Sequence, residues 1–129
     1  MIVDTSVFIA LIKAEDDAAD FVRRLLTKTP KRVSVGNYIE AHAVMIRKRI
    51  PHGGERLDML IHQVDCEVVP VDAEQAALAR DAYAEFGRGT GHPARLNFGD
   101  CFAYALAKAT GEPLLFKGDD FSRTDITAA

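Results

Sequence analysis

Short, largely apolar segments that alternate with longer amphipathic ones restrict the fold of this chain more than any other feature. Four such segments occur, at residues 1–4, 32–35, 66–71 and 114–116. Strands of this kind must be covered on both faces, which is typical of parallel sheets buried between helices. The sequence therefore predicts the α/β class, with a central, short parallel sheet flanked by helices.

The segments between these strands repeat apolar residues at helical spacing and begin with capping residues. Helices are expected at residues 5–13, 16–29, 38–50, 57–64, 72–86 and 100–110. The Gly36-Asn37 pair should break the chain before the third helix and cap it. Residues 87–93 should form a loop, and the tail beyond Arg123 should be loosely held.

Length and composition indicate one folded domain, residues 1–129. Hydrophobic residues make up 48% of the chain and charged residues 27%, unlike the composition of disordered proteins. No linker or repeat divides the chain. The start carries no basic leader, and its apolar run is too short to cross a bilayer, so a cytoplasmic protein without a membrane segment is expected.

Few residues suit a thiol-based or zinc-based function. Cys66 and Cys101 lie in apolar surroundings, where a buried, unreactive thiol is expected. The four histidines never fall into a zinc-ligand spacing with them. A net charge of −3 also argues against binding nucleic acid through overall positive charge, so any RNA contact must be local.

Acidic residues follow the predicted strands. Asp4 ends the first strand, Glu40 begins the helix after the second, Asp100 begins the helix before the last, and Asp119 follows the last. Each alone has an ordinary explanation as a helix cap, a helix-dipole partner or a turn residue. Together they point to a ligand site, because the carboxyl ends of parallel strands meet at one edge of the sheet.

Four carboxylates in one cleft would repel each other strongly unless a cation joined them. Ligands that are all oxygens select a hard cation, Mg²⁺ or Mn²⁺, rather than zinc. Such an ion makes bound water nucleophilic and neutralises charge on a phosphate. The acids therefore predict metal-dependent phosphodiester hydrolysis.

Four motifs in this order resemble the PIN-domain VapC toxins over essentially the whole chain. They are Ile2-Val3-Asp4-Thr5-Ser6, Glu40 after the second strand, Gly99-Asp100-Cys101-Phe102-Ala103-Tyr104-Ala105, and Lys117-Gly118-Asp119-Asp120-Phe121. The resemblance implies a PIN-like fold of three layers.

The resemblance also implies roles for individual side chains. Asp4, Glu40 and Asp100 match the acidic triad of the family, and Asp119 matches its fourth, more variable position. Asp120 competes with Asp119 for that role, and the sequence does not choose between them. Thr5 or Ser6 matches a hydroxyl that would hold a carboxylate, although either residue would serve equally as a plain helix cap.

A protein of this family would be the toxin of a type II toxin–antitoxin system, an endoribonuclease dependent on Mg²⁺ or Mn²⁺. The resemblance implies a VapB-type antitoxin, a toxin homodimer, and a structured RNA substrate such as tRNA or ribosomal RNA. Nothing in the sequence selects between those two RNA classes.

Basic residues near the acids are candidates for contacts with the RNA backbone. Arg88 and Arg95 lie in or beside the loop before Asp100, and Lys117 lies beside the last acids. We hypothesise that these three side chains position RNA phosphates. The basic run at residues 47–49 ends a helix, where cations need no functional explanation.

Two other functions remain open at this point. A signalling receiver domain also places acids around Mg²⁺ at strand ends, and Asp72 after the third strand would be its phosphorylated residue. That interpretation leaves Glu40, Asp100 and Asp119 without a purpose. A non-catalytic PIN-like module that binds proteins is the second alternative, although such a module would be expected to have lost an acid.

Overall fold

A computed structural model describes all residues, 1–129, and contains one four-stranded parallel sheet. The strands are β1 (Ile2–Val3), β2 (Lys31–Ser34), β3 (Cys66–Val69) and β4 (Leu114–Leu115), in the order β3-β2-β1-β4. Every neighbouring pair is parallel. The predicted parallel sheet is confirmed, and β1 is one of its two central strands.

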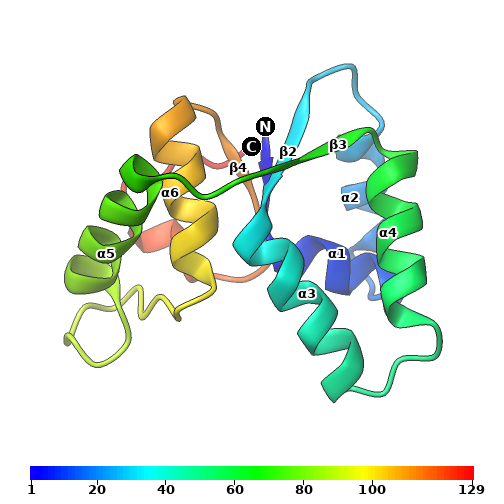
Figure 1. The fold of residues 1–129 in the computed structure, drawn as a ribbon, viewed down its shortest axis with the longest axis horizontal. Helices are drawn as coiled ribbons and strands as arrows, with labels where there is room; N and C mark the ends of the chain where they lie inside the picture. Colours follow the sequence, from blue (N-terminus) through cyan, green and yellow to red (C-terminus); the bar gives the residue numbers. More distant parts are fainter.

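Six α-helices cover the two faces of this sheet. They are α1 (Thr5–Ile12), α2 (Ala18–Leu25), α3 (Val35–Arg47), α4 (Gly53–Gln63), α5 (Ala73–Phe86) and α6 (Asp100–Thr110). Figure 1 shows α1 to α4 on one side and the α5–α6 pair on the other, which confirms the three-layer α/β fold. None of these helices combines the length and the hydrophobicity that a membrane crossing requires.

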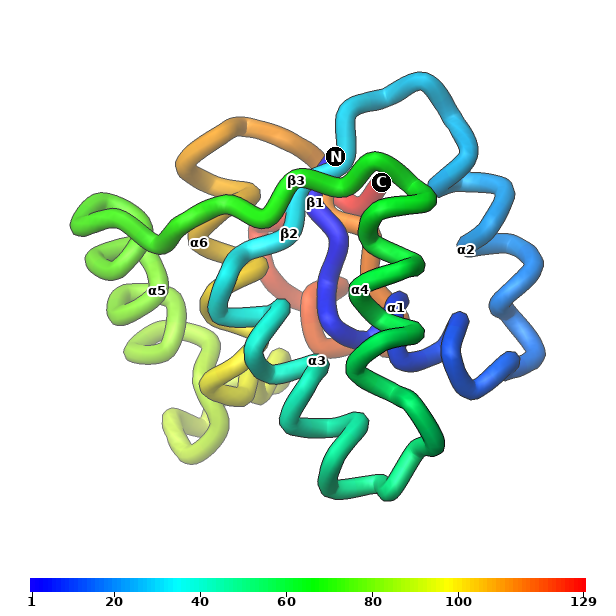
Figure 2. The backbone as a smooth tube through the Cα atoms, turned by 45° about the vertical axis from the view of Figure 1, so that its right-hand side comes forward, coloured from blue at the N-terminus to red at the C-terminus, as the bar shows by residue number.

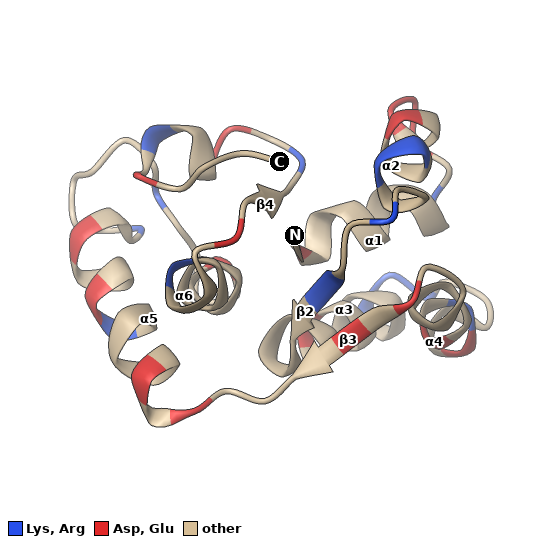
Figure 3. Cartoon of the chain, turned by 90° about the horizontal axis from the view of Figure 1, so that it is seen from above, with Lys and Arg blue, Asp and Glu red and all other residues tan.

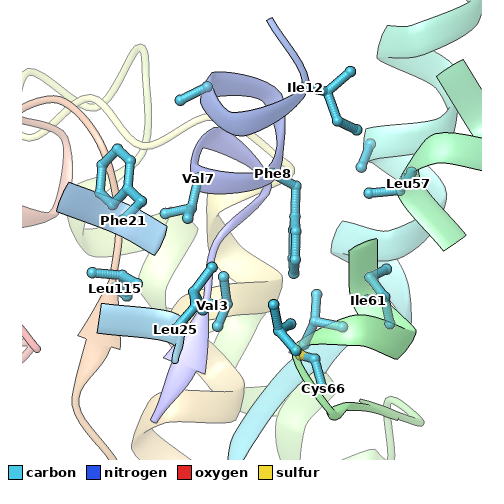
Figure 4. Close-up of a cluster of buried hydrophobic side chains, with 14 of the residues drawn as sticks. Val3, Val7, Phe8, Ile12, Phe21, Leu25, Leu57, Ile61, Cys66 and Leu115 are labelled. Carbon is cyan, nitrogen blue, oxygen red and sulfur yellow. The ribbon is translucent and has the colours of Figure 1, made fainter. Parts of the chain in front are cut away.

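Side chains that alternate along the short strands divide the core into two clusters. Val3 and Leu115 join the cluster beneath α1 to α4, whereas Ile2 and Leu114 join the cluster beneath α5 and α6. Figure 4 shows the first cluster, in which Phe8 of α1 fills the space between β1 and α4. The central strand β1 and the strand β4 are thus buried on both faces, as the sequence pattern requires, whereas Glu67 and Val68 of the edge strand β3 are exposed.

The start of α3 differs from the prediction. The helix begins at Val35, with Ser34 as its N-cap, because the Ser34 side chain accepts a hydrogen bond from the backbone N–H of Gly36 at 3.3 Å. The Gly36-Asn37 pair therefore lies inside the first turn and does not break the chain. As a consequence, Glu40 lies in the second turn of α3 rather than the first.

The C-terminal tail is also held more firmly than predicted. The Leu114 N–H donates to the Thr127 carbonyl, and the Ala129 N–H donates to the Leu114 carbonyl, both at 2.9 Å. β4 is an edge strand whose free backbone groups need partners, and the tail supplies them. Figures 1 and 2 show the result, with the two chain ends close together at the same end of the sheet. A short 3₁₀ helix, η1 (Phe121–Arg123), was not predicted.

Candidate active site

Asp4 lies at the junction between β1 and α1 and is almost fully buried. Its Oδ2 accepts hydrogen bonds from the Ser6 backbone N–H at 2.9 Å and from the Ser6 hydroxyl at 2.6 Å. Burial raises the pKa of Asp4, the Ser6 bonds oppose the rise, and the charge of Asp120 adds to it. Its Oδ1 is buried without any hydrogen bond, so one carboxylate oxygen remains free to accept a cation.

Glu40 approaches the same region from α3. Its Oε2 accepts a hydrogen bond from the Thr5 hydroxyl at 3.1 Å and a longer one from the Asn37 amide at 3.5 Å. Burial raises the pKa of Glu40, and the charge of Asp4 raises it further. Thr5 and Ser6, the two predicted hydroxyls, thus contact different carboxylates, Glu40 and Asp4 respectively.

Asp100 is the first residue of α6, and its backbone and side chain are paired reciprocally with Asn97. Asp100 Oδ2 accepts from the Asn97 N–H at 2.7 Å, and Asn97 Oδ1 accepts from the Asp100 N–H at 2.9 Å. Burial raises the pKa of Asp100 to about 7, against the Asn97 bond, and the charges of Asp4, Asp120 and Glu40 add to the rise. Three acids from distant parts of the chain therefore act on Asp100.

The fourth of these acids is Asp120 rather than Asp119. The Asp120 charge raises the pKa of both Asp4 and Asp100. Asp119 makes a turn instead, since its backbone carbonyl accepts from the Ser122 N–H and hydroxyl. These charge effects favour the alternative that the sequence left open, although Asp119 matches the family position equally well.

Asn37 belongs to this site and was missed by the sequence reasoning. It is fully buried, and its side-chain amide donates to the Gly99 carbonyl at 3.0 Å and to the Thr5 hydroxyl at 3.2 Å. One amide thereby ties α1, α3 and the start of α6 together beneath Glu40. The interpretation of Asn37 as a helix cap concealed its position three residues before Glu40, on the same face of α3.

Gly99 allows the close approach of Glu40 to α6. A Cβ atom at Gly99 would collide with the carboxylate of Glu40. A larger residue beside Asp100 would therefore force that carboxylate to move.

The donor set fits a hard divalent cation, but the side chains are not gathered as a finished ligand cluster. No three of the acidic, histidine or cysteine side chains lie close enough together to hold an ion as they stand. The available donors are carboxylate oxygens, including the unpartnered Oδ1 of Asp4, which suits Mg²⁺ or Mn²⁺. Sharing one ion requires side-chain rotation, for which the exposed Asp120 and half-buried Glu40 have room.

The nearby thiol is a poor metal ligand. Cys101 is buried and donates to the Asn97 carbonyl, and burial raises its pKa to about 11. A thiol binds metals as a thiolate, so this one contributes little at neutral pH.

The basic residues divide into two groups. Arg88 and Arg95 are exposed and take part in no ion pair, which leaves them open to phosphates. Lys117 instead pairs with Glu15 at 2.6 Å and Asp17 at 2.8 Å, and these bonds raise its pKa. The structure therefore does not bring the Lys117 charge to the acids, although its backbone N–H donates to the Ser6 hydroxyl at 3.0 Å.

Arg47 lies nearer the site than its place at a helix end indicated. Its charge lowers the pKa of Glu40, which stands two turns earlier on α3. By contrast, Figure 3 shows mainly acidic positions along α5, a helix that would repel phosphates. Among the basic residues, Arg47 is the one whose charge acts on an acid of the site.

The parallel sheet, its helices and the acids that follow the strands agree with a PIN-type domain. The sequence model of the PIN domain matches residues 1–126. Ribonuclease VapC42 of Mycobacterium tuberculosis is 48% identical over 130 residues, covering the whole chain and 98% of that protein. Ribonuclease VapC28 of the same organism is 50% identical over 129 residues, covering the whole chain and 97% of that protein. The chain belongs to the VapC ribonucleases of the PIN-domain family.

Solved structures of similar proteins share the fold. The crystal structure of VapC20 from Mycobacterium tuberculosis, a toxin described as cleaving the sarcin-ricin loop, matches with a TM-score of 0.78 and 20% identity. The match covers 99% of this chain and 97% of that one. The VapBC2 complex of Rickettsia felis, bound to a promoter DNA fragment, matches with a TM-score of 0.75 and 16% identity, over 98% and 94% of the two chains.

The receiver-domain alternative does not survive these findings. Asp72 follows the edge strand β3, and β2 separates that strand from β1 and Asp4. Its side chain caps α5 by accepting from the Gln75 N–H at 2.8 Å. Family membership excludes a receiver domain as well, since the relatives are ribonucleases.

Proposed function

We propose that this chain is the toxin of a type II toxin–antitoxin system and an endoribonuclease that hydrolyses RNA phosphodiester bonds with Mg²⁺ or Mn²⁺. The observation that carries the proposal is the approach of Asp4, Glu40 and Asp100 at one edge of the sheet, where burial raises the pKa of each and neighbouring carboxylate charges, including that of Asp120, add to the rise. A cluster of this sign favours a divalent cation, and the names of the relatives specify RNA cleavage. A non-catalytic module would have no need to keep these acids.

The roles of the side chains follow from their contacts. Asp4, Glu40 and Asp100 would hold the ion, with Asp120 rather than Asp119 as the fourth carboxylate. When bound, a divalent ion makes water nucleophilic and neutralises charge on the phosphate. Ser6 fixes the Asp4 carboxylate through Oδ2, which leaves Oδ1 without a hydrogen-bond partner and available to a cation.

Hydrogen bonds around Glu40 preserve its geometry. Thr5 and Asn37 both donate to its Oε2, and Asn37 also anchors the backbone at Gly99. Groups that orient carboxylate ligands are worth large factors in metal affinity, so these two residues position the site without touching RNA. Arg88, Arg95 and Arg47 are the candidates for contacts with RNA phosphates.

The relatives also indicate partners. Complexes of toxin and antitoxin from Klebsiella pneumoniae and Rickettsia felis share this fold. We infer a VapB-type antitoxin, a toxin homodimer, a cytoplasmic location and a structured RNA substrate of the tRNA or ribosomal RNA class for this chain. The cleavage of the sarcin-ricin loop by VapC20 supports the ribosomal choice as the first substrate to test.

The test compares variants on a mixed cellular RNA pool with Mg²⁺, with Mn²⁺ and with a chelator. Natural protein should release discrete fragments, and chelator, Asp4→Asn or Asp100→Asn should each abolish them. Asp81→Asn is the matched control, because Asp81 is exposed on α5 and pairs only with Arg80. Cleavage that persists in chelator or in Asp100→Asn would disprove the mechanism.

A further inference from the structure

Phe98 is the one exposed phenylalanine of this chain. Its exposure is 74%, whereas the other six phenylalanines are buried or half-buried. A single exposed apolar residue is ordinary on a protein surface, so exposure alone carries no argument. The position of Phe98 does, because it comes two residues before Asp100 and next to Gly99, against which Glu40 lies.

The ring of Phe98 is supported along one side by a second ring. Phe102, in the first turn of α6, meets it edge-to-face, with 5.1 Å between ring centroids and an angle of 84° between planes. Phe102 in turn lies directly on the backbone of Gly36, where any Cβ atom would strike its ring. Phe98 is therefore braced from behind while most of its surface faces solvent.

Phe98 separates two hollows of the surface. One, of about 480 Å³, is lined by Glu40, Ile39, Asn97, Gly99 and both rings, and so joins a carboxylate of the site to an apolar wall. The other, of about 440 Å³, lies over α5 and is almost wholly apolar, with Val71, Ala79 and Tyr83 among its lining residues. Both volumes fall in the range of sites that hold small organic groups.

We propose that Phe98 stacks on an unpaired RNA base next to the scissile phosphate and thereby helps to select the cleavage position. A nucleotide has a charged phosphate at one end and a base with an apolar face at the other. The hollow beside Glu40 combines the matching two properties. It has a carboxylate of the proposed cation site at one end and an aromatic wall at the other. Base stacking on aromatic side chains is a common way to recognise single-stranded RNA.

This inference rests on the proposed ribonuclease function and adds a residue that positions the substrate. The neighbouring apolar hollow gives a base room to lie on either side of the ring. Stacking accepts any base, so selectivity would come from which nucleotide can leave its helix and reach the ring. A looped or bulged nucleotide meets that condition, and a paired one does not.

The experiment measures steady-state cleavage of a purified RNA, chosen as one that the natural protein cleaves, by Phe98→Ala, Phe98→Tyr and Phe98→Trp. Phe98→Ala should lower kcat/KM by about tenfold, mainly through KM, and the two aromatic variants should restore it. Leu26→Ala is the matched control, because Leu26 is 71% exposed and follows α2. Thermal melting should be unchanged in all four variants.

A second arm replaces single nucleotides beside the cleavage site with abasic ones. With natural protein, an abasic nucleotide at the stacked position should lower kcat/KM about tenfold relative to intact RNA. With Phe98→Ala, the abasic RNA and the intact RNA should give the same kcat/KM. Equal cleavage by natural protein and Phe98→Ala would overturn the inference while leaving the ribonuclease intact. Absence of cleavage by natural protein would instead defeat the proposed function. Unchanged RNA cleavage together with weakened binding of a VapB-type antitoxin would assign the ring to a protein partner.

Discussion

Asp100→Asn should make the metal-free protein more stable at neutral pH even though it removes activity. Burial and neighbouring carboxylates raise the pKa of Asp100 from 3.8 to about 7. That rise corresponds to a penalty of about 4 kcal/mol on the charged form in the folded state. An amide avoids this penalty, but it loses about 1 kcal/mol of the charge-assisted bond from the Asn97 N–H. A net gain of about 1–3 kcal/mol in the free energy of unfolding is expected.

The pH dependence of this gain follows from the direction of the pKa change. Folded protein keeps the Asp100 proton to a higher pH than unfolded protein does, so the natural chain loses stability as pH rises from about 4 to about 7. The amide does not titrate. The difference between variant and natural protein should therefore be small near pH 4, grow with pH, and level off above pH 7.

Urea unfolding in a chelating buffer at pH 4.5, 6 and 8 measures this difference. Asp119→Asn is the control, since Asp119 is exposed. Addition of Mg²⁺ should then stabilise the natural protein and leave Asp100→Asn almost unchanged, because only a state that binds the ion gains from it. A variant less stable than the natural protein at pH 8 in chelator would refute the reasoning about buried, mutually repelling carboxylates.

Three further predictions test other parts of the site. Asp120→Asn should lower metal-dependent RNA cleavage at least tenfold and Asp119→Asn less than twofold, in parallel assays; the reverse order would restore Asp119 as the fourth acid. Asn37→Ala should lower the free energy of unfolding by about 1–3 kcal/mol in urea titrations, because the Gly99 carbonyl and Thr5 lose a buried donor. Gly99→Ala should displace the Glu40 carboxylate and lower RNA cleavage, while the circular dichroism spectrum stays that of the natural protein. Full cleavage activity in this variant would contradict the prediction.

Local pattern was enough to predict the sheet, its parallel sense and the order of the acids. Apolar strands and helical spacing are properties of neighbouring residues, and they led to the correct layers. Because parallel strands end at a common edge, three acids that follow or flank them could be expected to converge on the basis of sequence alone. The charge of Asp4 does raise the pKa values of Glu40 and Asp100, in addition to the larger effect of burial.

Contacts between distant segments decided the rest. Lys117 lies beside two acids in the sequence, yet its partners are Glu15 and Asp17, about a hundred positions away. The local sequence of the turn after β4 does not show which of its two acids acts on the site. In the folded chain, the charge of Asp120 rather than that of Asp119 raises the pKa of Asp4 and Asp100. The sequence by itself determined which kinds of side chain gather at the sheet edge. Only the tertiary structure decided which of two adjacent carboxylates acts on the buried acids and which charges are already paired, because both depend on residues that meet through folding.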